Sequence, residues 1–422
     1  MARATVFEST QIGVETDPGT RVAALKRLLC TGITINPQIK SEPFRPFGGK
    51  APTTSVPRKE YTDGPIEGVL AYGDIVYLLS SLLGEAEITT PEGATNTRRW
   101  TFKPKQWDPD AFKTFSVDKG SMLGASSVAN VIVNALTMSF AQDKADISGS
   151  VFGKAIVDGV QMSGNEIQTI TMTATSGTFT VTFGGQETDD LDWNAAASDL
   201  QTALEALDNI VPGDVIVTKS LGVFSVEFAG NYRQMDVDPI TLDITSLTGG
   251  TATVTELTKG VEPTDIAELP VSPLCVALYV ADAAADLATG KLTNALEAEL
   301  SVSDKYTRLM TLDPDETSFS EPVERAPSLV AKLVLTHGSV AEDMVEDLRS
   351  AKKKFMRILA SQGEIETGFP YRIQITFPFA FDSNERGDSD DVYASTFPLN
   401  LEYDADFGGY LEVVVDNDLT AL

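Results

Sequence analysis

Few side chains in this 422-residue sequence could carry out catalysis, and none of them forms a known catalytic pattern. The only histidine is His337, so a zinc site with several histidines is excluded by number, and no histidine-based triad is expected. The sequence contains no CxxC, P-loop or GxGxxG pattern. Two carboxylates alone could hydrolyse a glycoside, but nothing singles out a pair. We therefore expect a protein that is not an enzyme and that needs no cofactor.

Two short acidic segments are the remaining candidates for a metal site. They are 313–316 (DPDE) and 388–391 (DSDD), and neither has the ligand spacing of an EF-hand. Solvated loops are the simpler interpretation, so no metal site is expected. The two cysteines, Cys30 and Cys275, lie far apart in apolar segments. We expect them to be buried free thiols, as in a protein assembled in a reducing cytosol.

The chain is strongly acidic, with a formal net charge of −29, and 42% of its residues are hydrophobic. It can bury a core and is long enough for two or three domains. Such acidity argues against a protein that binds nucleic-acid phosphates, although it allows nucleic acid to pass nearby without binding. The acidity could also serve only solubility. Neither an export signal nor a membrane-spanning run is recognisable, so a soluble intracellular product is expected.

The elements that organise the chain are predicted strands at 128–153 and 291–312. In the first segment two strands, joined by a turn at 142–144, alternate apolar and small polar residues. We expect both segments to lie in one sheet with a buried apolar face, made by Leu136, Met138, Phe140, Leu296, Leu300 and Val302. The opposite face would carry Thr137, Ser139, Ser148, Ser150, Glu297, Glu299 and Ser301.

The rest of the chain suggests a mainly β protein with few helices. Helices are predicted at 74–83 and, after a capping box at Ser339, over 339–359. A long segment at 40–67, rich in proline and glycine, is expected to be a loop that forms an interface. Residues 166–260 differ in pattern from the rest of the chain: they predict short strands and one helix that Asn194 could cap. The predicted divisions are an N-terminal arm (1–20), a first domain part (21–165), an inserted α+β domain (166–260) and a second domain part (261–422).

Several strings together resemble the major tail, or tail tube, proteins of long-tailed siphophages. They are Glu15, Gly19-Thr20, Phe44-Arg45-Pro46, Lys59-Glu60, Gly68, Ile75–Leu79 and Leu83-Gly84, with the strand pattern of 131–153 and 329–415. The inserted segment resembles a domain found in phage structural proteins, through residues 175–186 (TSGTFTVTFGGQ) and 200–207 (LQTALEAL).

This resemblance implies a tail-tube β-sandwich or barrel with one packed helix, and an inserted domain on the tube exterior. Subunits would form stacked homohexameric rings of a non-contractile tail, through which the genome is ejected. The implied partners are the protein itself, the tape measure protein, and the tail terminator and tip proteins. Double-stranded DNA would pass without specific binding, and no membrane would be involved. The implied location is the virion tail, assembled in the host cytoplasm.

Two groups of residues receive roles under this interpretation. The seven residues of the polar face listed above would line the lumen of the tube, where acidic side chains repel DNA phosphates. Phe44, Arg45 and Phe47 would make contacts between subunits, since aromatic residues and arginine dominate interfaces. Two alternatives remain: another tail ring protein, such as a distal tail or baseplate hub, and a β-rich bacterial surface adhesin.

Overall fold

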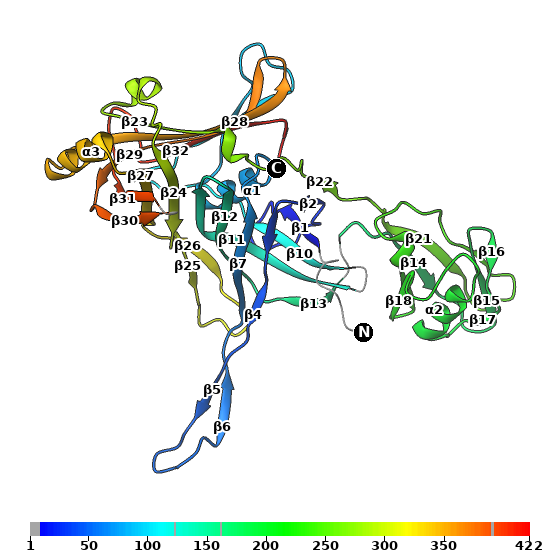
Figure 1. The fold of residues 1–422 in the computed structure, drawn as a ribbon. Coiled ribbons are helices and arrows are strands. Elements are labelled where there is room, and N and C mark those ends of the chain that lie inside the picture. Colours follow the sequence, from blue (N-terminus) through cyan, green and yellow to red (C-terminus); the bar gives the residue numbers. More distant parts are fainter. Residues whose placement is uncertain (1–8, 122–123, 161–162, 390–391) are drawn as a thin grey trace.

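The computed structural model describes residues 9–121, 124–160, 163–389 and 392–422. Strands dominate it, so the expected mainly β class is confirmed. A body and a separate module are distinguishable (Figure 1). The body strands before the module are β1 (Ser9–Val14), β2 (Lys26–Leu28), β3 (Thr31–Ile33), β4 (Asn36–Gln38), β5 (Ser41–Phe44), β6 (Thr54–Pro57), β7 (Tyr61–Val69), β8 (Glu87–Thr89), β9 (Arg98–Phe102), β10 (Phe115–Ser121), β11 (Gly124–Phe140), β12 (Ala145–Gly153) and β13 (Val157–Val160).

The body continues after the module and also holds two α-helices. Its later strands are β22 (Thr264–Asp265), β23 (Val276–Ala281), β24 (Ala295–Ser303), β25 (Tyr306–Leu309), β26 (Glu321–Glu324), β27 (Ser328–Thr336), β28 (Lys354–Glu366), β29 (Phe369–Phe381), β30 (Glu385–Ser389), β31 (Val392–Leu401) and β32 (Glu412–Asn417). The helices are α1 (Asp74–Leu82) and α3 (Ser339–Arg349).

One antiparallel layer of the body runs in the order β7–β12–β11–β24–β27–β31. Its last strand pairs with β29, which also pairs with β28 and β32. Helix α1 touches both β11 and β9, and all of its residues are buried. The strands therefore enclose a large apolar core around α1, to which Ile66, Leu136, Leu300, Phe377 and Val413 contribute. A smaller apolar cluster in the body is formed by Ile132, Phe152, Tyr306 and Phe319. The prediction that 128–153 and 291–312 share a sheet is confirmed by the pairing of β11 with β24.

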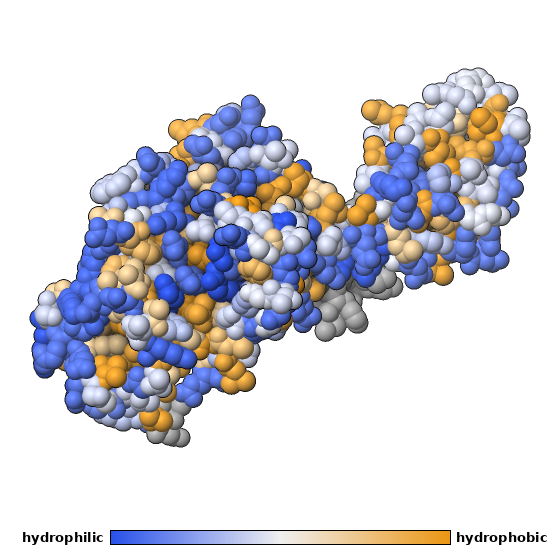
Figure 2. Space-filling view, turned by 90° about the horizontal axis from the view of Figure 1, so that it is seen from above, coloured by the Kyte–Doolittle hydropathy of each residue, from blue (hydrophilic) through white to orange (hydrophobic). Residues whose placement is uncertain are grey.

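The module has sheets and a hydrophobic core of its own. Its elements are β14 (Ile167–Met172), β15 (Thr178–Phe183), β16 (Gln186–Glu187), β17 (Leu191–Asp192), α2 (Ala197–Glu205), β18 (Val215–Ser220), β19 (Val223–Phe228), β20 (Thr241–Asp243) and β21 (Ala252–Thr258). Helix α2 begins later than expected from Asn194: the Asp199 carboxylate accepts the Ala196 N–H at 2.9 Å. Figure 2 shows the module joined to the body through a narrow neck.

The N-terminal arm expected over residues 1–20 is wrong for its described part. Strand β1 pairs with β10 and β2, and Ile12 is fully buried. The Glu15 carboxylate then accepts hydrogen bonds from Gly19 N, Ser116 Oγ and Asn130 N. Apolar burial and this buried carboxylate therefore fix the segment to the body. Residues 1–8 lie outside the described residues.

The segment 40–67 is not a loop. Strands β5 and β6 form a two-stranded hairpin that projects from the body, and residues 61–69 form β7 inside the main sheet (Figure 1). Pro43 and Pro57 stand within β5 and β6 because the exposed ladder of a lone hairpin tolerates residues without an N–H. The proline and glycine content of this segment therefore indicated a projecting hairpin and not an irregular loop.

The helix predicted over 339–359 ends at Arg349, and the rest of the segment is strand β28. The backbone turns at Ala351, whose φ of 49° lies in the left-handed region. Beyond it Met356, Ile358 and Ala360 alternate into the core, which is a strand period. The lysines after the helix pair with acidic side chains: Lys354 Nζ lies 2.7 Å from an Asp347 carboxylate oxygen.

Candidate assembly surfaces

The seven residues predicted to share a polar face do so in the structure, across β12, β11 and β24. Thr137 lies opposite Ser148 on one side and Ser301 on the other, and the Thr137 and Ser301 hydroxyls are 2.9 Å apart. Ser139 lies opposite Glu299. The remaining members are Ser150 and Glu297. All seven are partly or fully exposed, so this polar sheet face meets solvent in the single chain.

The opposite face of the same strands is buried, as expected for Leu136, Met138, Phe140, Leu300 and Val302. Leu296 is only half-buried. The register of β24 against β27 shifts between Ala295 and Glu297, so this residue sits at an irregularity and not in the regular ladder.

The polar sheet face also carries a lysine that sequence reasoning missed. Lys332 on β27 lies opposite Glu299, and its Nζ is 2.6 Å from Glu297 Oε1 and 3.7 Å from Glu299 Oε2. The acidic wall expected from Glu297 and Glu299 is therefore partly neutralised. Glu67 on β7, opposite Ser148, extends the face on its other side. Lys332 could have been found from the alternation of residues 329–335, where it falls on the polar side.

The residues predicted to join subunits lie on the projecting hairpin, which we call the arm (residues 40–58). Phe44 is 55% exposed, and Phe47 at the tip is fully exposed. Arg45 is used partly within the arm, where its Nε donates to the Gly49 carbonyl at 2.6 Å. Exposed apolar side chains on a thin projection stabilise no fold of their own, so they mark a surface made for a partner.

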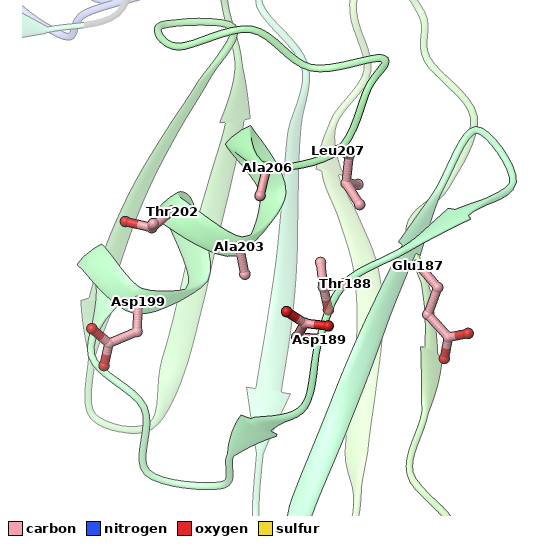
Figure 3. A pocket seen from close by; sticks show the side chains of 8 residues that line it. All are labelled: Glu187, Thr188, Asp189, Asp199, Thr202, Ala203, Ala206 and Leu207. Carbon is pink, nitrogen blue, oxygen red and sulfur yellow. The ribbon is translucent and has the colours of Figure 1, made fainter.

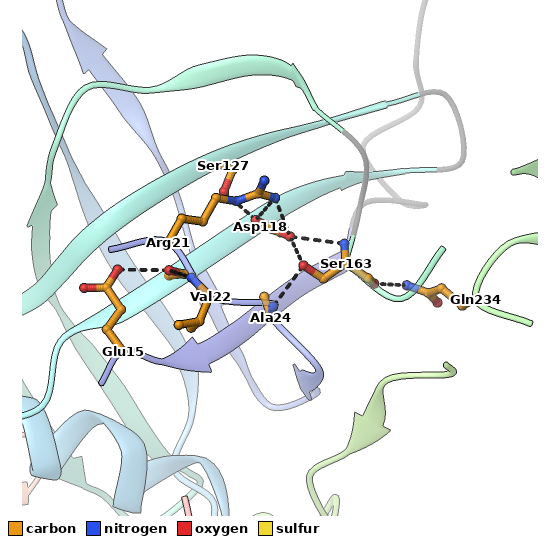
Figure 4. Close-up of polar contacts among 9 residues, drawn as sticks. Glu15, Arg21, Val22, Ala24, Asp118, Ser127, Ser163 and Gln234 are labelled. Atoms are coloured by element: carbon orange, nitrogen blue, oxygen red, sulfur yellow. Dashed lines mark hydrogen bonds and ion pairs between the residues drawn. The ribbon is translucent and has the colours of Figure 1, made fainter. Parts of the chain in front are cut away.

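The module meets the body at a small polar junction (Figure 4). Asp118 is fully buried in the body and accepts hydrogen bonds from Arg21, Ser127 Oγ and Ser163 Oγ. The Ser163 carbonyl in turn accepts the Gln234 side-chain N–H from the module at 3.1 Å. Buried carboxylate bonds thus fix where the chain leaves the body, whereas the module itself is held by few contacts.

Removing the module should leave a folded body. The Val261 N–H donates to the Gly164 carbonyl at 2.9 Å, so the chain leaves and re-enters at adjacent points and a short linker can join them. Because the module has its own core, calorimetry of the deletion should keep the body's cooperative transition and lose the module's. Gln234→Ala in the full chain is the control and should keep both transitions. Loss of cooperative melting in the deletion would show that the two parts fold together.

The module contains a pocket of about 500 Å³ between α2 and the segment after β16 (Figure 3). Its acidic residues, Glu187, Asp189 and Asp199, come from different elements and do not converge on one point. Within the described residues no group of three His, Cys, Asp or Glu side chains could hold a metal ion. Of the acidic segments singled out in the sequence, 313–316 lies in a loop, whereas Asp390 and Asp391 lie outside the described residues.

Strongly shifted ionisations are explained by local structure. Burial raises the pKa of Asp74 to about 6, opposed by the hydrogen bond from Cys30 N. Burial also raises the pKa of the Cys30 thiol to about 11, which makes it unreactive. Both cysteines are free and partly buried. His337 Nδ1 lies 3.0 Å from Ser395 Oγ, and its Nε2 lies 3.9 Å from Glu342 Oε1. Ser395 is fully buried, so its hydroxyl is not placed to attack a substrate as the serine of a triad does.

Glu366 is a second case, at the tip of the β28–β29 hairpin. Its carboxylate accepts the N–H groups of Thr95, Asn96 and Thr97 and the Thr97 hydroxyl, and these bonds lower its pKa to about 2. A carboxylate whose pKa is lower in the folded than in the unfolded chain stabilises the folded state at pH values above the unfolded pKa. This stability is lost as the pH falls from the unfolded pKa of 4.5 toward the folded pKa of about 2. The protection factors for amide hydrogen exchange at residues 95–97, measured against the intrinsic rate at each pH, should therefore fall between about pH 4.5 and 2, and should already be low in Glu366→Gln at pH 7. Glu364→Gln is the control. Equal protection in Glu366→Gln and the unsubstituted chain would contradict this role.

A buried ion cluster not foreseen from the sequence lies beneath the end of β24. Lys305 is 1% exposed, and its Nζ lies 2.7 Å from Asp110 Oδ2 and 3.4 Å from Glu324 Oε1. Asp110 also accepts the Lys105 N–H, and its own N–H donates to Glu324. The cluster therefore ties segment 105–110 and β26 to the sheet. The sequence signal was weak: a lysine directly after an alternating strand.

Comparisons with known proteins give little beyond this geometry. No protein-family model matches the chain, and no curated protein matches it. Among solved structures one match is a chain of Mycobacterium phage Patience, with 20% identity and a TM-score of 0.19, over 28% of this chain and 48% of the phage chain. The match spans about half of that phage chain, and at this TM-score it supports no conclusion about function. In the described part of the chain, no helix is long and apolar enough to cross a membrane.

Proposed function

We propose that this protein is a structural subunit of a phage virion that assembles with its own copies into the rings of a non-contractile tail tube. The observation that carries the proposal is the polar sheet face, where hydroxyl and carboxylate side chains, with Lys332 among them, are backed directly by the core. Antiparallel sheets with one wet face suit the inner wall of a conduit. The protein has no enzymatic role in this proposal.

Two further features support it. The arm presents unburied aromatic side chains far from the body, as a subunit that contacts its neighbours needs. The module stands away from the body on a narrow neck, where it would not obstruct a lumen. In this proposal the module lies on the tube exterior, and DNA passes the polar sheet face without specific binding. Partners would be further copies of this chain, the tape measure protein, and the terminator and tip proteins of a virion tail.

Electron microscopy of the purified protein and of virions carrying it tests the proposal. We expect stacked rings, with six-fold symmetry in end views. Rings that never stack would favour a distal tail or baseplate hub protein instead. A strictly monomeric protein at high concentration, together with its absence from tail tubes, would overturn the proposal.

Reversing the charge of the polar sheet face should slow DNA passage. Glu297→Lys with Glu299→Lys places two new lysines beside Lys332, so these three positions change from −1 to +3. The Debye screening length grows from about 10 Å at 0.1 M salt to about 30 Å at 0.01 M, so charges are screened less at low salt. Attraction between the new lysines and the DNA phosphates should therefore delay ejection most at low salt. Fluorescence measurement of DNA release from intact virions gives the rate.

The control for this experiment reverses two charges on the module, Glu187→Lys with Asp189→Lys, both far from the polar sheet face. Tails carrying either pair should have normal length. If tails with lysines at 297 and 299 release DNA at the normal rate in low salt, the polar sheet face does not line the DNA path.

A further inference from the structure

We infer that the body binds an oxyanion of the phosphate type between Arg357, Arg372 and Thr376, a group that we call the arginine site. Arg357 lies on β28, and the other two residues lie on β29. Both strands belong to the sheet that continues through β32 to β9, in the upper part of the body in Figure 1. The site involves neither the polar sheet face nor the arm, and it does not rest on the proposed function.

Strand pairing brings the three side chains to one side of this sheet. Arg357 lies directly opposite Thr376. Arg372 precedes Thr376 by four residues on the same strand, so only Gln374 stands between them on that side. Ile375, which alternates with them, is fully buried in the core. The arginine site therefore lies on the side of the sheet that faces away from the core.

The arginine site lacks a hydrogen-bond acceptor. Arg357 Nε, Arg372 Nε and Thr376 Oγ1 are all buried, and none has a hydrogen-bond partner among the described residues. Thr376 is only 2% exposed. Buried polar groups are nearly always paired, because an unpaired one has lost water without replacement. All three atoms can donate a hydrogen bond, and two belong to cations, so the missing partner is an anion.

The side chains around the arginine site do not supply that anion. Asp416 on β32 is shared by two arginines, since its carboxylate oxygens lie 2.9 Å from Arg372 and 2.9 Å from Arg99. The Arg357 side chain forms no ion pair or hydrogen bond in the described part of the chain. One carboxylate therefore faces three guanidinium groups, in a chain whose net charge is −29.

The ionisation of Arg372 reflects the same shortage of negative charge. Burial lowers its pKa, and the positive charges of Arg99 and Arg357 act in the same direction. The nearby Glu412 on β32 lies 3.7 Å from Lys103, so a further lysine already uses its charge. An added anion would therefore reduce the repulsion among the guanidinium groups.

The arrangement of the donors favours a phosphate-type ion over a carboxylate. A guanidinium group binds either anion through two parallel hydrogen bonds. Here two guanidinium groups and one hydroxyl come from two strands, so the acceptor needs oxygens in more than one plane. Phosphate and sulfate are tetrahedral and meet this need, whereas a carboxylate is planar. The Arg372 side chain is 26% exposed, so an ion can enter from solvent as the guanidinium groups rotate.

Melting of the purified full chain in inorganic phosphate tests the site. At constant ionic strength, the melting temperature of the body should rise and then saturate, because a ligand of the folded state alone stabilises that state. Titration calorimetry gives the Kd. Phosphate also stabilises proteins because it is excluded from their surfaces. That effect does not saturate and should be the same in every variant.

Two substitutions separate binding from folding. Arg357→Met keeps the apolar stem and removes the guanidinium group, so it should raise the Kd for phosphate about tenfold or more. Thr376→Val keeps the shape and removes the hydroxyl, so it should also weaken binding. Neither should lower the melting temperature in chloride, since each removes an unpaired buried donor. Arg233→Met, at an exposed arginine of the module, is the matched control and should bind phosphate normally.

Two further ligands identify the class and source of the anion. Equal binding of inorganic phosphate and glycerol 1-phosphate would support a phosphate group carried by a larger molecule, and binding of inorganic phosphate alone would support the free ion. Tighter binding of acetate than of phosphate would overturn the phosphate class. A response that does not saturate, or that is equal in Arg357→Met, would overturn the site. The measurements use the monomeric chain, so they are independent of the test for tube assembly.

Discussion

Phe44→Ser with Phe47→Ser is expected to abolish assembly while the melting temperature stays unchanged. Phe44 is 55% exposed and Phe47 fully exposed, so the monomer loses almost no buried surface. Burying one phenylalanine at an interface stabilises it by about 1.5–3 kcal/mol. Losing both costs about 3–6 kcal/mol per contact, or roughly 10² to 10⁴ in affinity. Sedimentation velocity and negative-stain imaging measure assembly, and calorimetry measures the fold.

The matched control replaces two exposed leucines of the module, Leu221→Ser with Leu257→Ser, which remove similar apolar surface away from the arm. That variant should assemble normally. Arg45→Ala with Phe47→Ala should also block assembly, but Arg45 bonds to Gly49 within the arm, so part of its effect would come from a looser tip. Tubes of normal length from the double serine variant would show that the arm makes no assembly contact.

Sequence reasoning located the polar sheet face because period-two alternation identifies which residues share a side of a strand. Thr137 and Ser301 are 164 positions apart, yet alternation in each segment sufficed to place both on the wet side. Alternation failed where two periods compete. Residues 355, 358 and 359 also fit a helical stripe, and nothing local announced the left-handed turn at Ala351 that ends α3.

Contacts between distant polar residues were beyond reach for a different reason. Lys332 stands within an alternating strand and Lys305 stands directly after one, but only the fold decides that the first lies on the polar sheet face and the second lies beneath the sheet. The partners of Lys305 come from segments 195 residues before it and 19 after it. Alternation assigns a side chain to a face, whereas pairing of buried charges depends on how loops cross the sheet.

Lys305→Met is expected to destabilise the body by about 3–5 kcal/mol, because it leaves the buried Asp110 carboxylate without its cation. Methionine is similar in length and fills the space without a charge. Asp110 would still accept the Lys105 N–H, yet its negative charge stays almost entirely out of water. Calorimetry should show the body's transition at a lower temperature and the module's transition unchanged, since the module's core is separate.

A double-mutant cycle distinguishes loss of the ion pair from loss of packing. Lys305→Met with Asp110→Asn removes both charges, so it should lose less stability than the sum of the single substitutions. Lys332→Met is the matched control: this lysine also contacts two carboxylates, but on a solvent-exposed face, where such pairs contribute about 0–1 kcal/mol. Equal losses for Lys305→Met and Lys332→Met would mean that Lys305 is solvated in the folded protein. Strictly additive effects at positions 305 and 110 would mean that the two side chains do not stabilise each other.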